Sequence, residues 1–198
     1  MEKQPSEKCC NSLPSASWNE KHLKLNTSSH PTLRELESEV GRFCFGAWNS
    51  PERGRLLVLA GNNGNGKTMM SNAVLKWVNH VGHIKKFMKE GEIRHLDCIH
   101  WAWPKLLDIL KGGGWDVIDD MFDTCVLVID DLGAGHDTSG IGTDKLCQLL
   151  SRREKKWTMI TTNITPDAWQ DKFDRRVASR LIRNSILVDL SDVPDYHG

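Results

Sequence analysis

Apolar residues in this chain occur either in short continuous runs or at helical spacing, and the two patterns alternate from residue 32 onward. The runs are typical of strands covered on both faces of a parallel sheet and lie at 56–60, 98–103, 125–131, 158–163 and 185–190. The helically spaced stretches predict helices at 32–48, 68–82, 104–110, 143–157, 165–173 and 174–185. This alternation predicts an α/β fold, a parallel sheet flanked by helices, with its chemistry outside the carboxyl ends of the strands.

Turn-forming residues set the expected ends of several helices. Gly82 is expected to end the second helix, because glycine readily adopts the backbone angles that close a helix. Pro104 is expected to open the third helix. Thr165 followed by Pro166 has the pattern of an N-cap and a first helical position, which predicts where the fifth helix begins.

Residues 1–30 are polar, rich in Ser and Asn, and predict a mobile tail without a fold of its own. Residues 31–198 are enough for one domain with a sizeable core. Lys and Arg number 26, as do Asp and Glu, so the formal net charge is zero. Without a global basic field, any contact with nucleic acid has to come from a local patch.

The six cysteines are scattered along the chain, and Cys125 begins an apolar run. This usage is typical of reduced cytosolic thiols rather than of a disulfide framework. The sequence shows no signal peptide and no apolar run of membrane-spanning length. These features predict a cytoplasmic protein without a membrane partner.

The segment AGNNGNGKTMM, residues 60–70, joins the first strand to the second helix. Its glycine spacing and the pair Lys67-Thr68 match the phosphate-binding loop G-x-x-x-x-G-K-[ST], in the strand–loop–helix context that this motif requires. Glycine permits the backbone angles that turn successive N–H groups toward a triphosphate. We expect Lys67 to bind the β- and γ-phosphates of ATP and Thr68 to ligate Mg²⁺. The expected nucleotide-binding residues are Gly61, Asn62, Asn63, Gly64, Asn65, Gly66, Lys67, Thr68 and Met69.

Two carboxylates, Asp130 and Asp131, follow the third apolar run. Asp130 is expected to hold Mg²⁺, and Asp131 to orient or deprotonate the attacking water. Asn163 ends the fourth run, where its amide is placed to read the γ-phosphate by hydrogen bonds; an ordinary helix cap is the alternative interpretation. Together with the phosphate loop, these residues predict an ATPase that uses Mg²⁺.

The last predicted helix carries Arg176 and Arg180 four residues apart, on one face, and Arg183 a further turn along. An arginine there does not easily reach its own phosphate loop but can reach that of a neighbour as an arginine finger; a solvated basic helix is the alternative. Residues 115–144 contain eight Asp and no Lys or Arg, whereas residues 151–183 contain nine Lys or Arg against four acids. Surfaces of opposite charge predict a homo-oligomer with head-to-tail contacts, closed as a ring or open as a helix.

The motifs GNNGNGKT, VLVIDDLG, MITTNITPDAW and RRVASRLIRNS occur in this order between about residues 45 and 190. In order and separation they resemble the DnaC-type helicase loaders and the related IstB-type transposition ATPases, a branch of the AAA+ family. The resemblance implies a P-loop ATPase that oligomerises on single-stranded DNA and delivers a hexameric helicase. It also implies a sensor role for Asn163 and makes Arg180 the likelier finger.

The chain departs from that family in three respects. Only a polar tail and one helix precede the core, where the loaders usually carry a domain that grips the helicase. The end of the chain reads DVPDYHG, with His197 where the family often has an arginine near the nucleotide, so reduced nucleotide affinity or turnover is expected. No full C-terminal helical lid of the general AAA+ kind is expected after the last strand.

Contact with single-stranded DNA is expected where aromatic side chains have cations nearby. Lys111 and Trp115 are expected to lie on a flexible loop with the sequence KGGGWD, whereas Trp101 and Trp103 alternate along a strand and are expected to pack one face of the sheet. Further candidate cations lie before the second strand and beside Trp157, namely Lys85, Lys86, Arg94, Arg152, Arg153, Lys155 and Lys156.

Other functions stay open at this stage. An IstB-like transposition helper, acting on a transposase, has the same motifs. A small-molecule kinase should show an Arg-rich lid and an acceptor pocket, and the sequence displays neither. A nucleotide-binding adaptor that does not hydrolyse ATP fits the presence of Asp rather than Glu beside Asp130.

Overall fold

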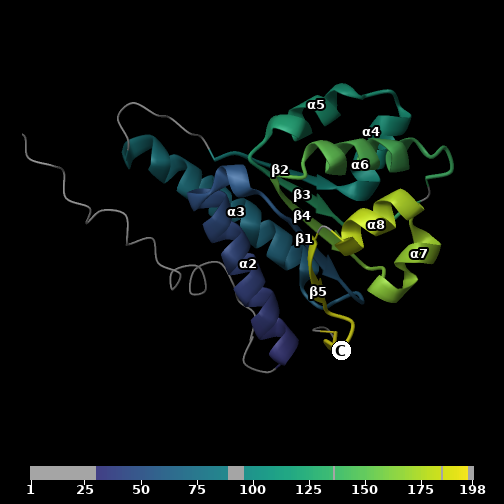
Figure 1. Ribbon diagram of the computed structural model, residues 1–198, viewed down its shortest axis with the longest axis horizontal. Helices are drawn as coiled ribbons and strands as arrows, with labels where there is room; N and C mark the ends of the chain where they lie inside the picture. Colours follow the sequence, from purple (N-terminus) through teal and green to yellow (C-terminus); the bar gives the residue numbers. More distant parts are fainter. Residues whose placement is uncertain (1–29, 89–95, 136, 184, 196–198) are drawn as a thin grey trace, which may run out of the picture.

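The computed structural model describes residues 30–88, 96–135, 137–183 and 185–195. Its centre is a sheet of five parallel strands in the order β2-β3-β4-β1-β5 (Figure 1). The strands are β1 (Leu56–Ala60), β2 (Cys98–Ala102), β3 (Val126–Asp130), β4 (Trp157–Thr162) and β5 (Ser185–Asp189). The predicted α/β fold with a parallel sheet is therefore confirmed.

The strand order decides which segments meet. β4 pairs with β1 on one side and with β3 on the other, and every residue of β3 and β4 is buried. Strands covered on both faces read as continuous apolar runs, which is why the sequence pattern located them. Because the carboxyl ends of parallel strands meet at one edge, Asp130, Asn163 and the loop after Ala60 lie along the same edge of the sheet.

One face of the sheet is covered by α2 (Pro31–Asn49) and α3 (Lys67–Met88), with the 3₁₀ turn η3 (Pro51–Arg53) between α2 and β1 (Figure 1). His30 caps α2 by accepting a hydrogen bond from the Thr32 backbone N–H. The apolar side of α2 packs into a core cluster that includes Leu36, Val40 and Phe43 from the helix. Burial of this stripe, rather than capping alone, fixes α2 on the sheet.

The opposite face carries α4 (Trp103–Lys111), α5 (Asp116–Asp123), α6 (Ile141–Arg152), α7 (Trp169–Lys172) and α8 (Arg175–Arg183), with the 3₁₀ turn η4 (Pro166–Ala168) before α7 (Figure 1). A second core cluster joins these helices to the sheet. Thr165 is the N-cap of η4 by position but makes no side-chain capping bond. After β5, the described chain up to Asp195 forms no further helix.

The predicted end of the second helix is wrong. α3 continues through Gly82 to Met88. A glycine inside a helix costs about 1 kcal/mol relative to alanine, which weakens a helix without ending it. A single glycine such as Gly82 is therefore not enough to end a helix of this length.

The region around Trp115 also differs from the prediction. The helix α5 was not predicted, and Trp115 stands directly before it rather than on a free loop. The indole N–H of Trp115 donates to the Leu110 carbonyl at 3.2 Å, which anchors the ring. Trp103 begins α4 instead of ending β2, although it shares a core cluster with Trp101, as expected.

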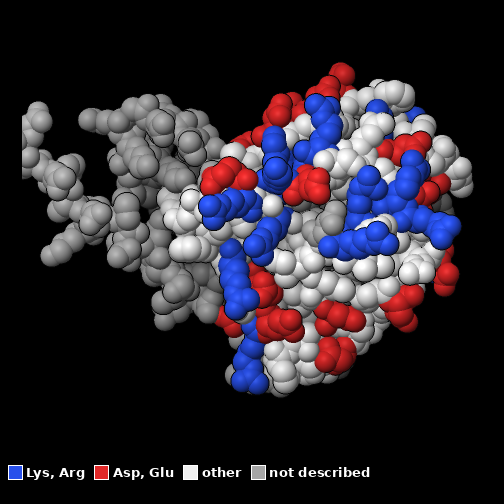
Figure 2. All heavy atoms as spheres, viewed as in Figure 1, with Lys and Arg blue, Asp and Glu red and all other residues white. Residues whose placement is uncertain are grey.

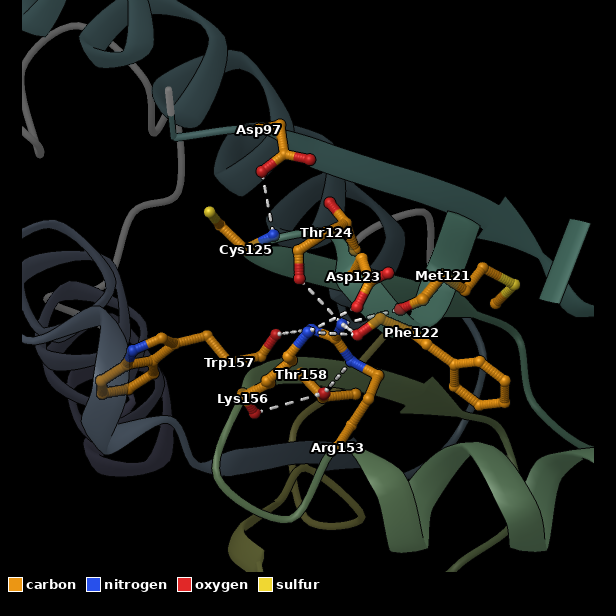
Figure 3. A network of polar contacts seen from close by, with 10 residues as sticks. All are labelled: Asp97, Met121, Phe122, Asp123, Thr124, Cys125, Arg153, Lys156, Trp157 and Thr158. Carbon is orange, nitrogen blue, oxygen red and sulfur yellow. Dashed lines mark hydrogen bonds and ion pairs between the residues drawn. The ribbon is translucent and has the colours of Figure 1, made fainter. Parts of the chain in front are cut away.

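Arg153 is a buried cation that ties the amino ends of two strands to α5 (Figure 3). Its guanidinium donates at 2.7–3.0 Å to oxygens of Met121, Thr124, Trp157 and Thr158. Burial lowers the pKa of Arg153 to about 10, against the opposing effect of Asp97. The expectation that Arg153 contacts DNA is therefore wrong, because only 2% of its surface is exposed.

Candidate functional site

The loop between β1 and α3 has the backbone shape that a phosphate-binding loop needs. The φ angle is +135° at Gly61, +77° at Gly64 and +88° at Gly66, a region that favours glycine. There is also no room for a side chain, since a Cβ on Gly61 would lie 2.6 Å from the Leu190 carbonyl carbon and one on Gly64 would lie 1.8 Å from Oδ1 of Asp195. The loop leads into the N-terminus of α3, whose dipole favours a bound anion.

Lys67 is buried with its ammonium group turned back across this loop. Its Nζ donates to the carbonyls of Gly61 at 3.0 Å and Asn62 at 2.5 Å, and to Oδ1 of Asn65 at 2.8 Å. Burial lowers the pKa of Lys67 to about 8, while the carboxylates of Asp131 and Asp130 act in the opposite direction. An ammonium has three rotatable donors, so Lys67 can exchange these acceptors for phosphate oxygens.

The other loop residues divide by exposure. Asn62 and Asn63 are exposed, as are Thr68 and Met69 at the start of α3. Asn65, in contrast, is completely buried. The sequence motif did not distinguish the buried asparagine from its exposed neighbours.

Asp130 ends β3 with only 6% of its surface exposed. Its Oδ1 accepts a hydrogen bond from Thr161 Oγ1 at 2.6 Å. Ser71 Oγ lies 3.1 Å from the same oxygen and 2.9 Å from the Thr68 carbonyl, so its one proton is available to either. Ser71 and Thr161 thus join Asp130 to the first turn of α3, and sequence reasoning singled out neither of them.

Asp131 points to a different group from Asp130, as expected of adjacent residues. It has a φ of +60°, its N–H donates to Thr161 Oγ1 at 2.8 Å, and its Oδ1 accepts from Asn163 Nδ2 at 2.5 Å. Burial and then the neighbouring Asp130 raise the pKa of Asp131, opposed by Lys67 and Asn163. A strained backbone and a raised carboxyl pKa occur together at many functional sites.

These residues fit a magnesium nucleotide. The glycine cradle admits no side chain, and Lys67 supplies a nearby positive charge. The Thr68 hydroxyl and the Asp130 carboxylate offer the hard oxygen ligands that Mg²⁺ prefers. The predicted residues of the phosphate loop, β3 and β4 therefore gather at one edge of the sheet.

Arg180 lies at the opposite edge. With Leu56 and Thr158, at the amino ends of β1 and β4, it lines a cavity of about 370 Å³. Its guanidinium donates to Ser151 Oγ at 2.8 Å and to the Arg176 carbonyl at 3.0 Å. The structure thus separates Arg180 from the phosphate loop of its own chain.

The acidic stretch 115–144 and the basic stretch 151–183 do not form two separate faces. Arg176 pairs with Asp144 at 2.8 Å, and Lys156 pairs with Asp123 at 3.3 Å. Lys and Arg side chains gather over α8, but Asp and Glu side chains lie on the same face (Figure 2). The expected segregation of charge is therefore incomplete.

Trp115 is the exposed aromatic residue among the candidate contacts with DNA. Trp115 is 50% exposed, and the ammonium of Lys145 lies 4.4 Å from its ring centroid. Arg94, His197 and the tail up to residue 29 lie outside the described residues, as do the side chains of Lys85 and Lys86. Trp115 and Lys145 thus form one aromatic–cation pair among the described residues, and Arg152 forms another with the ring of Phe122.

The fold is similar to that of several solved structures. With DnaI the TM-score is 0.67 at 18% identity, covering 90% of this chain and 94% of that one. With the DnaC helicase loader it is 0.64 at 19% identity, covering 81% and 90%. With the replication initiator DnaA bound to AMPPCP and single-stranded DNA it is 0.59 at 16% identity, covering 79% and 46%. The likeness confirms the P-loop AAA+ fold and, at the level of fold, the resemblance to DnaC-type proteins.

No protein-family model matches the sequence, and no curated protein matches it. Among the described residues, no helix combines the length and the apolar character needed to cross a membrane. The likeness to the loaders is accordingly one of fold and of motifs.

Proposed function

We propose that this protein is an ATPase of the helicase-loader type, which assembles head to tail on single-stranded DNA to deliver or remodel a replicative helicase. The observation that carries the proposal is the convergence of the phosphate loop, Asp130, Asp131 and Asn163 at one edge of the sheet. The fold likeness to the DnaC helicase loader and to DnaI supports a role in replication.

The proposed chemistry assigns one task to each group. The magnesium nucleotide supplies the γ-phosphoryl group and the divalent charge. The loop N–H groups and Lys67 bind the β- and γ-phosphates, while Thr68 and Asp130 hold Mg²⁺. Asp131 orients the attacking water and accepts its proton, and Asn163 holds the Asp131 carboxylate in position.

A neighbouring subunit completes the site in this proposal. Arg180 lies on the edge opposite to its own phosphate loop, so a head-to-tail contact brings it toward the loop of the next copy. An arginine placed there stabilises the charge that develops on the transferred phosphoryl group. The bond from Arg180 to Ser151 would be exchanged for that contact.

Single-stranded DNA is the proposed scaffold for assembly. Trp115 exposes half of its surface beside Lys145, and an aromatic ring with a nearby cation suits base stacking. The DnaA neighbour was solved with single-stranded DNA, which supports this class of ligand. A transposase is the alternative partner, because the motifs are shared with IstB-type ATPases.

A non-hydrolysing adaptor is the second candidate, and one observation favours it. The Asn163 amide occupies one oxygen of Asp131 at 2.5 Å, which leaves that carboxylate less free to act on water. If the protein hydrolyses ATP in the presence of DNA and Asp131→Asn abolishes this, the adaptor role is excluded. If wild type binds ATP without hydrolysing it, the adaptor role replaces the ATPase.

The test of assembly is light scattering after size exclusion, with and without ATP and oligo-dT. Wild type is expected to assemble only when both are present, and Lys67→Ala and Arg180→Ala are each expected to remain monomeric. Arg34→Ala removes an exposed arginine of α2 and serves as the matched control. A wild-type monomer under every condition would contradict the loader function.

A further inference from the structure

The segment that follows β5 lies against the phosphate loop. We call residues 190–195 the strap. The Leu190 N–H donates to the Ala60 carbonyl at 2.7 Å, and the Ser191 carbonyl accepts from Asn62 Nδ2 at 3.2 Å. At its end, the Asp195 carboxylate fills the space where Gly64 would carry a side chain.

Asn65 connects the strap to Lys67. Its Nδ2 donates to the Leu190 carbonyl at 3.0 Å, and its Oδ1 accepts from Lys67 Nζ at 2.8 Å. Asn65 is completely buried, so each of these bonds replaces one that water would otherwise make. A phosphate loop binds its ligand through backbone N–H groups, and this side-chain bridge is an addition to that function.

The other side of the strap touches the start of α2, and Figure 1 shows the two segments close together. Thr32 Oγ1 donates to Asp192 Oδ2 at 3.0 Å, and His30 Nε2 lies 4.0 Å from the same oxygen. A continuous line of contacts therefore runs from α2 through Asp192, Leu190 and Asn65 to Lys67. α2 lies on the face of the sheet away from α8 and the other helices of the second cluster.

We propose that Asn65 is a positioning residue that couples Lys67 to the strap, and that the strap couples nucleotide affinity to the docking of α2. This inference rests on the proposed nucleotide site. Coupling of this kind is reciprocal, so a partner that pulls the start of α2 from Asp192 weakens nucleotide binding, and bound nucleotide holds α2 in place.

The first test measures the affinity for a fluorescent ATP analogue with Mg²⁺ in a set of Asn65 variants. Asn65→Ala loses both bonds, and affinity is expected to fall about tenfold. Asn65→Asp keeps the shape and the Lys67 bond but cannot donate to Leu190, and it holds the ammonium more tightly, so it is expected to bind at least as weakly. Asn65→Ser has a hydroxyl that can donate and accept but is one bond shorter than the amide, so it is expected to recover part of the affinity through the flexible Lys67 side chain. Asn79→Ala, an exposed asparagine of α3, is the control.

Thermal unfolding midpoints of the same variants separate positioning from general destabilisation. Asn65→Ala and Asn65→Ser both leave space in a buried site, so a merely structural role predicts equal losses of affinity for the two. Recovery in Asn65→Ser alone supports positioning. Equal affinity of Asn65→Ala and wild type overturns the inference while leaving the nucleotide site intact, and a wild type that binds no analogue overturns the proposed function.

The second test starts from the distant end of the strap. Thr32→Val removes the bond to Asp192 without changing shape or charge, and Thr32 makes its described contacts with Asp192 and His30. It is expected to weaken nucleotide binding about twofold in wild type and by clearly less in Asn65→Ala, because only the bridge through Asn62 then still joins the strap to Lys67. Equal effects of Thr32→Val in both backgrounds, or no effect in wild type, would overturn the coupling.

Discussion

Two buried cations lie at opposite edges of the same sheet, in different surroundings. Lys67, beyond the carboxyl end of β1, is 5% exposed and donates only to oxygens of its own loop in the described structure. Arg153, beside the amino end of β4, is 2% exposed and donates to oxygens of α5, of the turn before β3 and of β4. The acceptors of Lys67 lie in a single loop, whereas Arg153 joins three segments.

The difference shows why burial of a charge does not by itself identify a functional site. Burial lowers the pKa of Lys67 to about 8 and that of Arg153 to about 10, so both remain mostly protonated at neutral pH. The rigid fork of a guanidinium is matched here by fixed backbone carbonyls, whereas an ammonium can turn toward a new anion. Lys67, at the carboxyl edge, can therefore turn its ammonium toward an anionic ligand. Arg153, at the amino edge, instead holds neighbouring segments together.

Arg153→Leu, at the amino edge of the sheet, is expected to have the largest effect on stability. Several buried carbonyls lose their donor, so the free energy of unfolding is expected to fall by about 4 kcal/mol. Nucleotide affinity of the folded fraction should stay unchanged. Urea unfolding and nucleotide titration measure the two quantities, with Arg34→Leu as an exposed control. A loss of affinity without a loss of stability would place Arg153 in the functional site instead.

Two glycines with similar backbone angles allow one substitution to be tested inside and outside the phosphate loop. Gly64 and Gly113 have similar φ angles of +77° and +83°, but a Cβ at Gly113 meets no atom within 4 Å. Both alanine variants are expected to cost about 1–2 kcal/mol of stability through backbone strain. Gly64→Ala should in addition weaken nucleotide binding about tenfold, because its methyl group crowds the glycine loop whose backbone N–H groups bind the phosphates. Equal nucleotide affinity of the two variants would show that the loop tolerates this crowding.

Thr161 and Thr158, both in β4, allow the same substitution to be made at the carboxyl edge and at the amino edge of the sheet. These variants are expected to have the smallest effects of the three sets. Thr161→Val removes the hydroxyl between Asp130 and Asp131 and is expected to slow ATP hydrolysis about tenfold with little change in affinity. Thr158→Val removes an acceptor of Arg153 and is expected to cost about 1 kcal/mol of stability with hydrolysis unchanged. Steady-state kinetics and thermal unfolding of both variants check this, and exchanged phenotypes would contradict the assignment of the two edges.

The sequence predicted the parts of this molecule that depend on local pattern. The glycine loop, Asp130, Asp131 and Asn163 were located because each follows an apolar run, and parallel pairing brings such positions to one edge. Gly82 misled the prediction, because the same residue type also occurs inside helices.

The parts that were missed depend on contacts between distant residues. Ser71 and Asp130 are 59 residues apart, and Asn65 and Leu190 are 125 apart. The sequence does not show which distant residue a helical serine or a loop asparagine contacts, because that depends on the order of the strands in the sheet. The prediction of Arg153 as a surface cation was wrong for the same reason. Most of its acceptors are backbone carbonyls, and every residue type has a backbone carbonyl, so the sequence does not identify them.

The central claim is that the carboxyl edge of the sheet binds a magnesium nucleotide through Lys67. Isothermal titration of wild type, Lys67→Ala and Lys76→Ala with Mg-ATP tests it most directly, because Lys76 is an exposed lysine of the same helix. Wild type and Lys76→Ala are expected to bind one nucleotide per chain with equal affinity, and Lys67→Ala about 100-fold more weakly. Absence of binding in wild type, or equal binding by Lys67→Ala, would contradict the account.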